Sequence, residues 1–169
     1  MNQDSIKFPD SLKYETLISK RTVYGGGGVM PDYFVPLDTS QTTDVFSDLV
    51  RGGHVNNFCL TYADDNRETL HSNYMSFEDF KNYFTVDQSI IDDLLAYAAE
   101  EDEDFEFDEE EYKISESLLK MRIKGSIANN LWGISEFYQI YNDSNEILQA
   151  AIEIIESEKY NEAGLAPVE

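Results

Sequence analysis

The distribution of apolar residues divides the chain into a short β-prone beginning and a long helical remainder. Within residues 1–40, β-prone runs at 22–24 and 33–35 stand on either side of four consecutive glycines at 25–28. Two nearby prolines disfavour a helix in this part of the chain. From about residue 42 onward, apolar positions recur three and four residues apart, as on one face of an α-helix. The pattern predicts a mainly α fold, a helical bundle preceded by a short β-type segment.

Capping residues and glycines mark where the expected helices begin and end. An N-cap side chain accepts a hydrogen bond from a backbone N–H that the helix itself leaves unpaired. Ser76 and Asp79 have the spacing of a capping box, with Asp in place of the usual Glu. Gly52 and Gly53 are expected to end the first helix, because glycine readily follows a last helical turn. The other expected features are caps at Thr42 or Thr43, at Asp87, and at Ser144 or Asn145, and a helical run over about 55–70.

The longest periodic segment runs from about residue 108 to residue 132. Its apolar positions alternate between spacings of three and four, which predicts one continuous helical face. Gly133 is expected to interrupt the helix, after which the pattern resumes. The residues of the expected face are Ile114, Leu118, Met121, Gly125, Ala128 and Trp132.

The charge of the chain is strongly negative and unevenly spread. The 169 residues include 34 acidic and 12 basic side chains, a formal net charge of -22. Residues 1–40 hold five acidic and four basic side chains, so nearly all of the excess lies beyond them. Such a surface repels phosphate backbones and anionic membranes, which argues against nucleic-acid or membrane partners. We expect a β-type segment at 1–40, a helical domain at 41–160 and a flexible tail at 161–169.

Two unusual runs invite a functional interpretation. Gly25 to Gly28 lack the Gly-Lys-Ser/Thr ending of a phosphate-binding loop, and no strong helix follows them. They indicate a tight turn or a close backbone approach. Residues 100–111 hold ten carboxylates in twelve positions. Because no glycine stands at the sixth position of a calcium loop, this run favours a solvated acidic segment over a calcium site.

The histidines and the single cysteine show no pattern of a reactive centre. His54 and His71 are 17 residues apart without persuasive metal-ligand spacing, and His54 fits a cap or turn. Cys59 lies in an apolar stretch and is expected to be a small buried residue; alone, it forms no intrachain disulfide. No Gly-x-Ser-x-Gly nucleophile motif is present, and no apolar run approaches the roughly 18 residues of a membrane helix. We expect no catalytic, cofactor-binding or metal-binding residue in this chain.

The segment RTVYGGGGVMPDYFVPLD, residues 21–38, resembles the carboxy-terminal processing (tail-specific) serine peptidases. In that family a Gly-Ile/Val-x-Pro-Asp signature closes the catalytic domain, and residues 28–32 read Gly-Val-Met-Pro-Asp. The upstream run at 8–17 and the later helical sequence resemble a subgroup with a long helical C-terminal extension. The resemblance spans most of the chain, and its sharp part is the 18 residues quoted.

The resemblance implies a serine nucleophile and a lysine general base, with protein or peptide substrates. The serine-rich run and the Gly-Lys-Gly turn that would carry them do not occur in this sequence, nor does a PDZ module. The expectation is therefore an accessory region of such a peptidase, inactive alone. It would pack on the protease core, self-associate or limit substrate access, in the periplasm or cell envelope.

The alternative is an independent acidic helical module that binds a protein partner, cytoplasmic if the chain is complete. Its partner would occupy an aromatic groove lined by Phe77, Phe80, Tyr83 and Phe84. The helical spacing of these aromatics favours a simpler interpretation, in which they form the bundle core.

Overall fold

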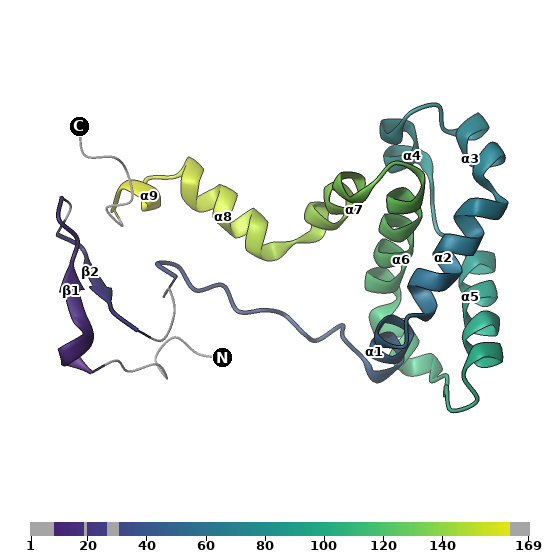
Figure 1. The fold of residues 1–169 in the computed structure, drawn as a ribbon, viewed down its shortest axis with the longest axis horizontal. Coiled ribbons are helices and arrows are strands. Elements are labelled where there is room, and N and C mark those ends of the chain that lie inside the picture. Colours follow the sequence, from purple (N-terminus) through teal and green to yellow (C-terminus); the bar gives the residue numbers. More distant parts are fainter. Residues whose placement is uncertain (1–8, 19, 27–30, 163–169) are drawn as a thin grey trace. The chain divides into compact units, whose positions relative to one another are not determined.

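The computed structural model describes residues 9–18, 20–26 and 31–162, which fall into two compact units (Figure 1). One unit is helical and spans residues 38–144. The other comprises the described residues of 1–37 and 145–169. The sequence predicted boundaries at 40/41 and 160/161, whereas the structure divides the chain at 37/38 and 144/145. Residues 145–160, which were expected in the helical domain, therefore group with the N-terminal residues.

The helical unit confirms the mainly α prediction. Its long helix α6 packs against α1, α2 and α7, while α2 also packs against α1 and α5 (Figure 1). The helices are α1 (Asp44–Arg51), α2 (His54–Asp65), α3 (Arg67–Asn73), α4 (Phe77–Tyr83), α5 (Gln88–Glu101), α6 (Glu109–Leu131) and α7 (Ile134–Tyr141).

The capping residues fix the helix starts where the sequence predicts them. The Thr43 hydroxyl accepts a hydrogen bond from the Phe46 backbone N–H and begins α1. Ser76 and Asp79 form a reciprocal capping box at α4. Asp87 caps α5 by accepting from the backbone of its third residue. These contacts are local, so they follow from short stretches of sequence.

The helical run expected at 55–70 is instead two helices. Its first part, α2, already begins at His54, and Asn66 separates it from α3. Both the backbone N–H and the side-chain amide of Asn66 donate to the Tyr62 carbonyl, at 3.1 and 2.9 Å. An Asn side chain that bonds to nearby backbone competes with helix continuation, which explains the break.

Helix α6 buries a different set of residues from the predicted face. Gly125 and Ala128 are buried as expected, but Ile114 is exposed. The prediction of one face was wrong because α6 has neighbours on several sides, so its buried surface is wider than one stripe. The buried residues of α6 are Tyr112, Ser115, Leu119, Ile123, Gly125, Ser126, Ile127 and Ala128.

The aromatic residues of α4 belong to the core. The rings of Phe80 and Phe84 stack with centroids 4.4 Å apart, and Phe80 also lies 5.1 Å from Trp132. Phe80 and Phe84 are buried, and Phe77 is partly buried beside Trp132. Of the four residues of the suggested aromatic groove, Tyr83 alone is exposed, at 72%. Phe80 and Phe84 therefore belong to the core that holds α4 against the end of α6.

The second unit contains little buried surface. Strands β1 (Lys13–Glu15) and β2 (Thr22–Tyr24) pair antiparallel, with Lys13 opposite Tyr24, and all of their residues are exposed. The β-prone run at 33–35 was expected to behave as strand, but it pairs with no strand among the residues that the structure describes. Of the glycine run, Gly27 and Gly28 lie outside the described residues.

The same unit holds the last two helices, α8 (Glu146–Glu156) and α9 (Lys159–Glu162). The Asn145 side chain caps α8 by accepting from Leu148 N, as predicted. The Tyr33 hydroxyl donates to the Lys159 carbonyl at 2.7 Å. Of the tail expected at 161–169, residues 161 and 162 end α9 and the rest lie outside the described residues.

Candidate functional site

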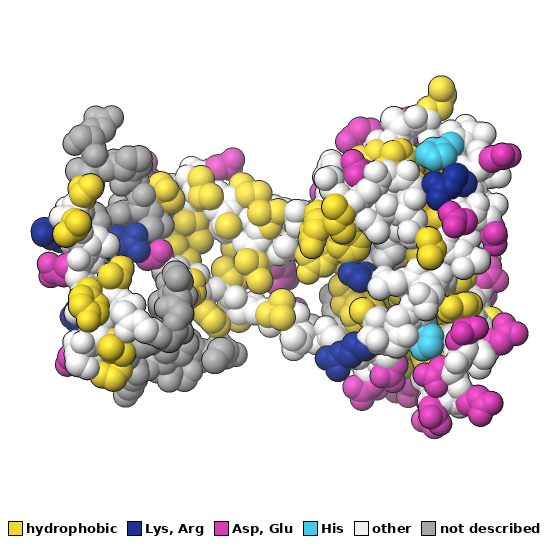
Figure 2. Space-filling view, viewed as in Figure 1, with side chains coloured by type: hydrophobic (Ala, Val, Ile, Leu, Met, Phe, Trp, Pro, Cys, Tyr) yellow, Lys and Arg dark blue, Asp and Glu magenta, His cyan; other side chains and the backbone are white. Residues whose placement is uncertain are grey.

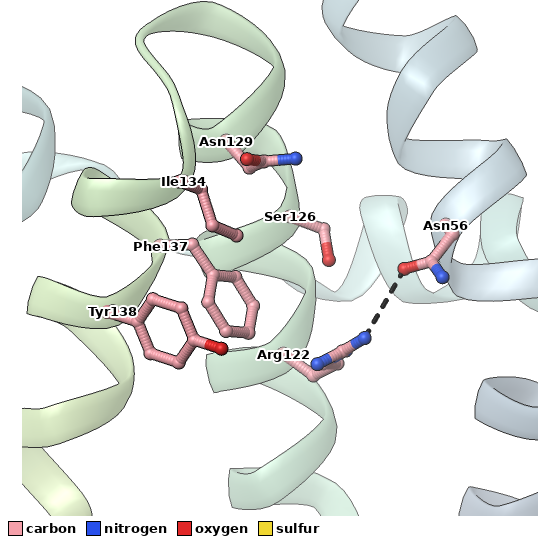
Figure 3. A pocket seen from close by; sticks show the side chains of 7 residues that line it. All are labelled: Asn56, Arg122, Ser126, Asn129, Ile134, Phe137 and Tyr138. Atoms are coloured by element: carbon pink, nitrogen blue, oxygen red, sulfur yellow. Dashed lines mark hydrogen bonds between the residues drawn. The ribbon is translucent and has the colours of Figure 1, made fainter.

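A surface groove with a volume of about 330 Å³ opens between α2, α6 and α7 (Figure 3). Three elements supply its walls, and polar and apolar side chains contribute together. The lining residues are Asn56 from α2, Arg122, Ser126 and Asn129 from α6, and Ile134, Phe137 and Tyr138 from α7.

Two glycines allow α7 to form a wall of this groove. Gly133, with a φ of +139°, sits between α6 and α7 in a conformation that other residues rarely adopt. Gly125 lies under the Phe137 ring, where an added Cβ would come within 2.9 Å of Phe137 Cδ2. The absence of a side chain at residue 125 therefore lets α7 approach α6 closely and places Phe137 in the lining of the groove.

Arg122 provides the positive charge of the groove. Its guanidinium carbon lies 5.0 Å from the centroid of the Phe137 ring, a cation–π contact. One terminal nitrogen donates to Asn56 Oδ1 at 3.5 Å, at the long limit of a hydrogen bond, and this pair spans the groove in Figure 3. Nε is buried without a hydrogen-bond partner. Among the described residues no carboxylate pairs with Arg122, although the chain carries 34 of them.

An apolar margin lies beside this cation. Ile134 is 58% exposed and Tyr138 is 52% exposed, and hydrophobic side chains gather over α7 in Figure 2. Arg presents a planar fork of donors that matches a carboxylate. The groove can therefore hold a ligand that combines apolar surface with a carboxylate, and its side chains include no nucleophile paired with a base.

Cys59 is a small buried core residue, as expected. Its side chain is fully buried in α2, and Sγ lies 3.8 Å from the Ile123 carbonyl oxygen. Burial raises the pKa of the thiol to about 12. A thiol with so high a pKa is protonated at neutral pH, so it is a poor nucleophile.

Both histidines have aromatic neighbours. His54 is buried at the start of α2, with Nε2 3.6 Å from Asp102 Oδ2 and its ring beside Phe105. His71 is exposed and meets Trp132 edge-on. Within the described ranges no serine hydroxyl hydrogen-bonds to either histidine. The structure thus brings His54 and Asp102 together but adds no third member of a catalytic triad.

The acidic run at 100–111 connects α5 to α6. Asp108 caps α6 by accepting from Glu110 N and Glu111 N, at 2.8 and 3.0 Å. Asp102 accepts from Asp104 N within the connecting loop. Over the described residues, no group of three or more His, Cys, Asp or Glu side chains is placed to hold a metal ion. The run serves as a helix cap and a solvated loop.

Sequence reasoning did not single out Arg122. The sequence marks it only weakly, because it is a single arginine with a small residue, Gly125, three positions later and a polar residue, Ser126, four positions later. The groove depends on α2 and α7 as well, and their approach to α6 is a tertiary feature. A basic residue on the same helical face as Ser126 and Asn129 was the available hint.

In the described part of the chain, no helix is both long enough and apolar enough to cross a membrane.

Comparison with known proteins gives one informative match. No curated protein and no solved structure matches the chain. A family model does match, over residues 45–133, which is more than half of the chain and covers α1 to α6. The chain therefore belongs to the family of unknown function DUF8443.

Proposed function

We propose that this chain is an accessory region of a carboxy-terminal processing serine peptidase and is inactive by itself. Residues 1–40 would complete the edge of a protease core, and the helical unit would act as a protein-interaction domain. We propose the periplasm or cell envelope as its location. The proposal rests on the resemblance at residues 21–38 and on one structural observation.

That observation is a β-hairpin whose large side chains are exposed. Tyr14, Val23 and Tyr24 are large side chains on β1 and β2, and all three are exposed. An isolated two-stranded hairpin is at best marginally stable in water. Strands of this kind gain stability when a larger sheet or a packed layer covers them. The exposed hairpin therefore supports docking onto another protein surface, such as a protease core.

The resembling segment is also held together as a unit. The Arg21 guanidinium pairs with the Asp32 carboxylate, which joins β2 to the Pro-Asp end of the signature. The Arg21 backbone N–H donates to the Thr16 hydroxyl at 3.0 Å. These contacts tie the hairpin to the Pro-Asp end of the signature, which supports treating the two as one piece of a larger domain.

The lysine chemistry supports a non-catalytic role for the chain alone. Burial lowers the pKa of Lys124, the change a lysine general base requires. Yet its Nζ donates to the carbonyl oxygens of Lys81 and Phe84, both at 2.7 Å. In the described residues no serine hydroxyl hydrogen-bonds to a lysine amine. The lysine ties α6 to the end of α4, and the described part of the structure pairs it with backbone carbonyl groups rather than with a nucleophile.

The test combines activity with binding. The purified chain alone should not cleave an unstructured peptide. Mixed with the catalytic core of a carboxy-terminal processing peptidase, it should bind, and the backbone amides of 13–15 and 22–24 should become protected from hydrogen exchange. Val23→Pro, which removes a strand N–H, should abolish binding. Leu60→Ser, a change of an exposed residue on α2, should not.

Two results would overturn this proposal. The first is peptide cleavage by the chain alone that persists through repurification. The second is an absence of added protection in the hairpin when the protease core is present in excess.

An independent acidic interaction module is the second candidate function. The groove beside Arg122 favours it, because a mixed apolar and cationic groove suits a protein ligand. Binding of a partner by the helical unit, with no binding to any protease core, would support this alternative.

A further inference from the structure

Helix α8 is apolar on one side and buries none of its residues. Ile147, Ile152 and Ile155 are 47%, 40% and 63% exposed. Their spacings place them on one side of the helix, and Figure 2 shows hydrophobic side chains along α8. An 11-residue helix is marginal in water on its own, so α8 needs a surface to cover this face.

Glu156 is the acidic residue of α8 that is best placed to pair with a cation outside the helix. It stands in the last turn, where a carboxylate opposes the helix dipole, and the described residues give it no partner. It follows Ile152 by one turn, so an apolar group and a carboxylate lie side by side. The other acids of α8 are already accommodated: Glu153 pairs with Lys159 at 2.7 Å, and Glu146 lies in the favourable first turn.

The groove on the helical unit has the complementary features. Ile134 and Tyr138 offer an exposed apolar margin, and Arg122 is a cation without a carboxylate partner in the described chain. A carboxylate that meets an Arg fork forms a charge-assisted pair, stronger than a neutral hydrogen bond. Each surface supplies what the other lacks.

We propose that α8 of one copy of the chain docks into the groove of a second copy, with Glu156 pairing to Arg122. The apolar face of α8 covers Ile134 and Tyr138. Each copy carries one helix and one groove, so the proposed assembly is a two-fold symmetric dimer in which two copies exchange two such contacts.

A second copy of the chain is the occupant that the charges favour. Every copy carries both an apolar helix that ends in Glu156 and a groove that holds Arg122, so the two complementary surfaces are always present together.

The experiment is sedimentation equilibrium of the full chain with charge-reversal variants. The wild type should show a concentration-dependent dimer. Arg122→Glu and Glu156→Arg should each weaken dimerisation about tenfold or more, because each places like charges at both contacts. An equal mixture of the two variants should dimerise like the wild type, since every groove then meets a helix of opposite charge.

Two further variants serve as matched controls. Arg51→Glu repeats the charge change of Arg122→Glu at an exposed residue of α1. Glu146→Arg repeats the charge change of Glu156→Arg at the other end of α8. Both should leave the dimer within about twofold of wild type. Circular dichroism of each variant should show unchanged helix content, which separates loss of docking from loss of folding.

Distinct outcomes would overturn the inference. One is a wild-type chain that stays monomeric at all accessible concentrations. Another is a mixture of the two single variants that fails to dimerise, together with a double variant, Arg122→Glu with Glu156→Arg, that is monomeric and as stable as the wild type. That pair of results would show docking within one chain. The contact involves the groove and α8 and not the hairpin, so its failure leaves the peptidase proposal standing, and the reverse also holds.

Discussion

Gly125 on α6 lies directly beneath the ring of Phe137 on α7, and a Cβ at residue 125 would come within 2.9 Å of that ring. We predict that Gly125→Val destabilises the helical unit by about 1–3 kcal/mol, because α7 must move away from α6. Denaturant unfolding measures the change. Ser117→Val is the control, since it adds the same side chain at an exposed position of α6. Equal effects at the two positions would contradict the close-approach argument.

Lys124 joins α6 to the end of α4 through two backbone carbonyl groups. Lys124→Met keeps most of the apolar stem but removes the donors, and we predict a loss of about 1–3 kcal/mol. The matched control is Lys113→Met on the same helix, which breaks only an exposed i,i+4 pair with Glu109. That pair contributes roughly 0.3–0.5 kcal/mol. A Lys124 variant as stable as the control would show that the two hydrogen bonds do not stabilise α4.

The Cys59 thiol should report on unfolding. At mildly alkaline pH, a thiol reagent should label the folded chain far more slowly than the chain in denaturant, because Cys59 is fully buried. The folded pKa of about 12 lies above the unfolded 9.0, so folding favours the protonated thiol. Its contribution to stability is therefore complete below pH 9.0 and declines as pH rises toward 12. Fast labelling of the folded chain would contradict the burial of Cys59.

The net charge of -22 should make the fold sensitive to salt. Like charges oppose compaction, and salt screens them. We predict that Tm rises when ionic strength increases from low to physiological. The ion pairs that salt would also weaken are largely exposed, so they contribute little in the other direction. A Tm that falls with added salt would show that attraction outweighs repulsion at this surface.

The Tm of the chain should be highest at a moderately acidic pH. Moderate acid protonates ordinary carboxylates, which relieves repulsion and should raise Tm. Hydrogen bonds from the Ser89 hydroxyl and the Ile90 backbone N–H lower the pKa of Asp87 below 3.8. Its contribution to stability is present above pH 3.8 and is lost as pH falls through the lower folded value. Asp87→Asn should therefore weaken the decline in Tm at strongly acidic pH, as thermal melts across pH would measure.

The sequence by itself determined the features that depend on near neighbours. Thr43, Ser76, Asp87 and Asn145 cap helices where their local sequence predicts, because a cap needs only a side chain and a backbone N–H three residues away. The helix class also followed from apolar spacing. The break at Asn66 was missed, because an asparagine within a run is compatible with either a continuous or an interrupted helix.

Tertiary structure decided which surfaces are covered. The buried face of α6 is set by α1, α2 and α7 together, and the periodicity of one helix does not count its neighbours. A strand needs a partner. Residues 13–15 pair with 22–24, whereas within the described ranges the β-prone run at 33–35 has no strand beside it. The groove at Arg122 likewise exists only where α2, α6 and α7 converge. Capping acts over one turn of chain, whereas burial, pairing and groove formation depend on segments far apart in sequence.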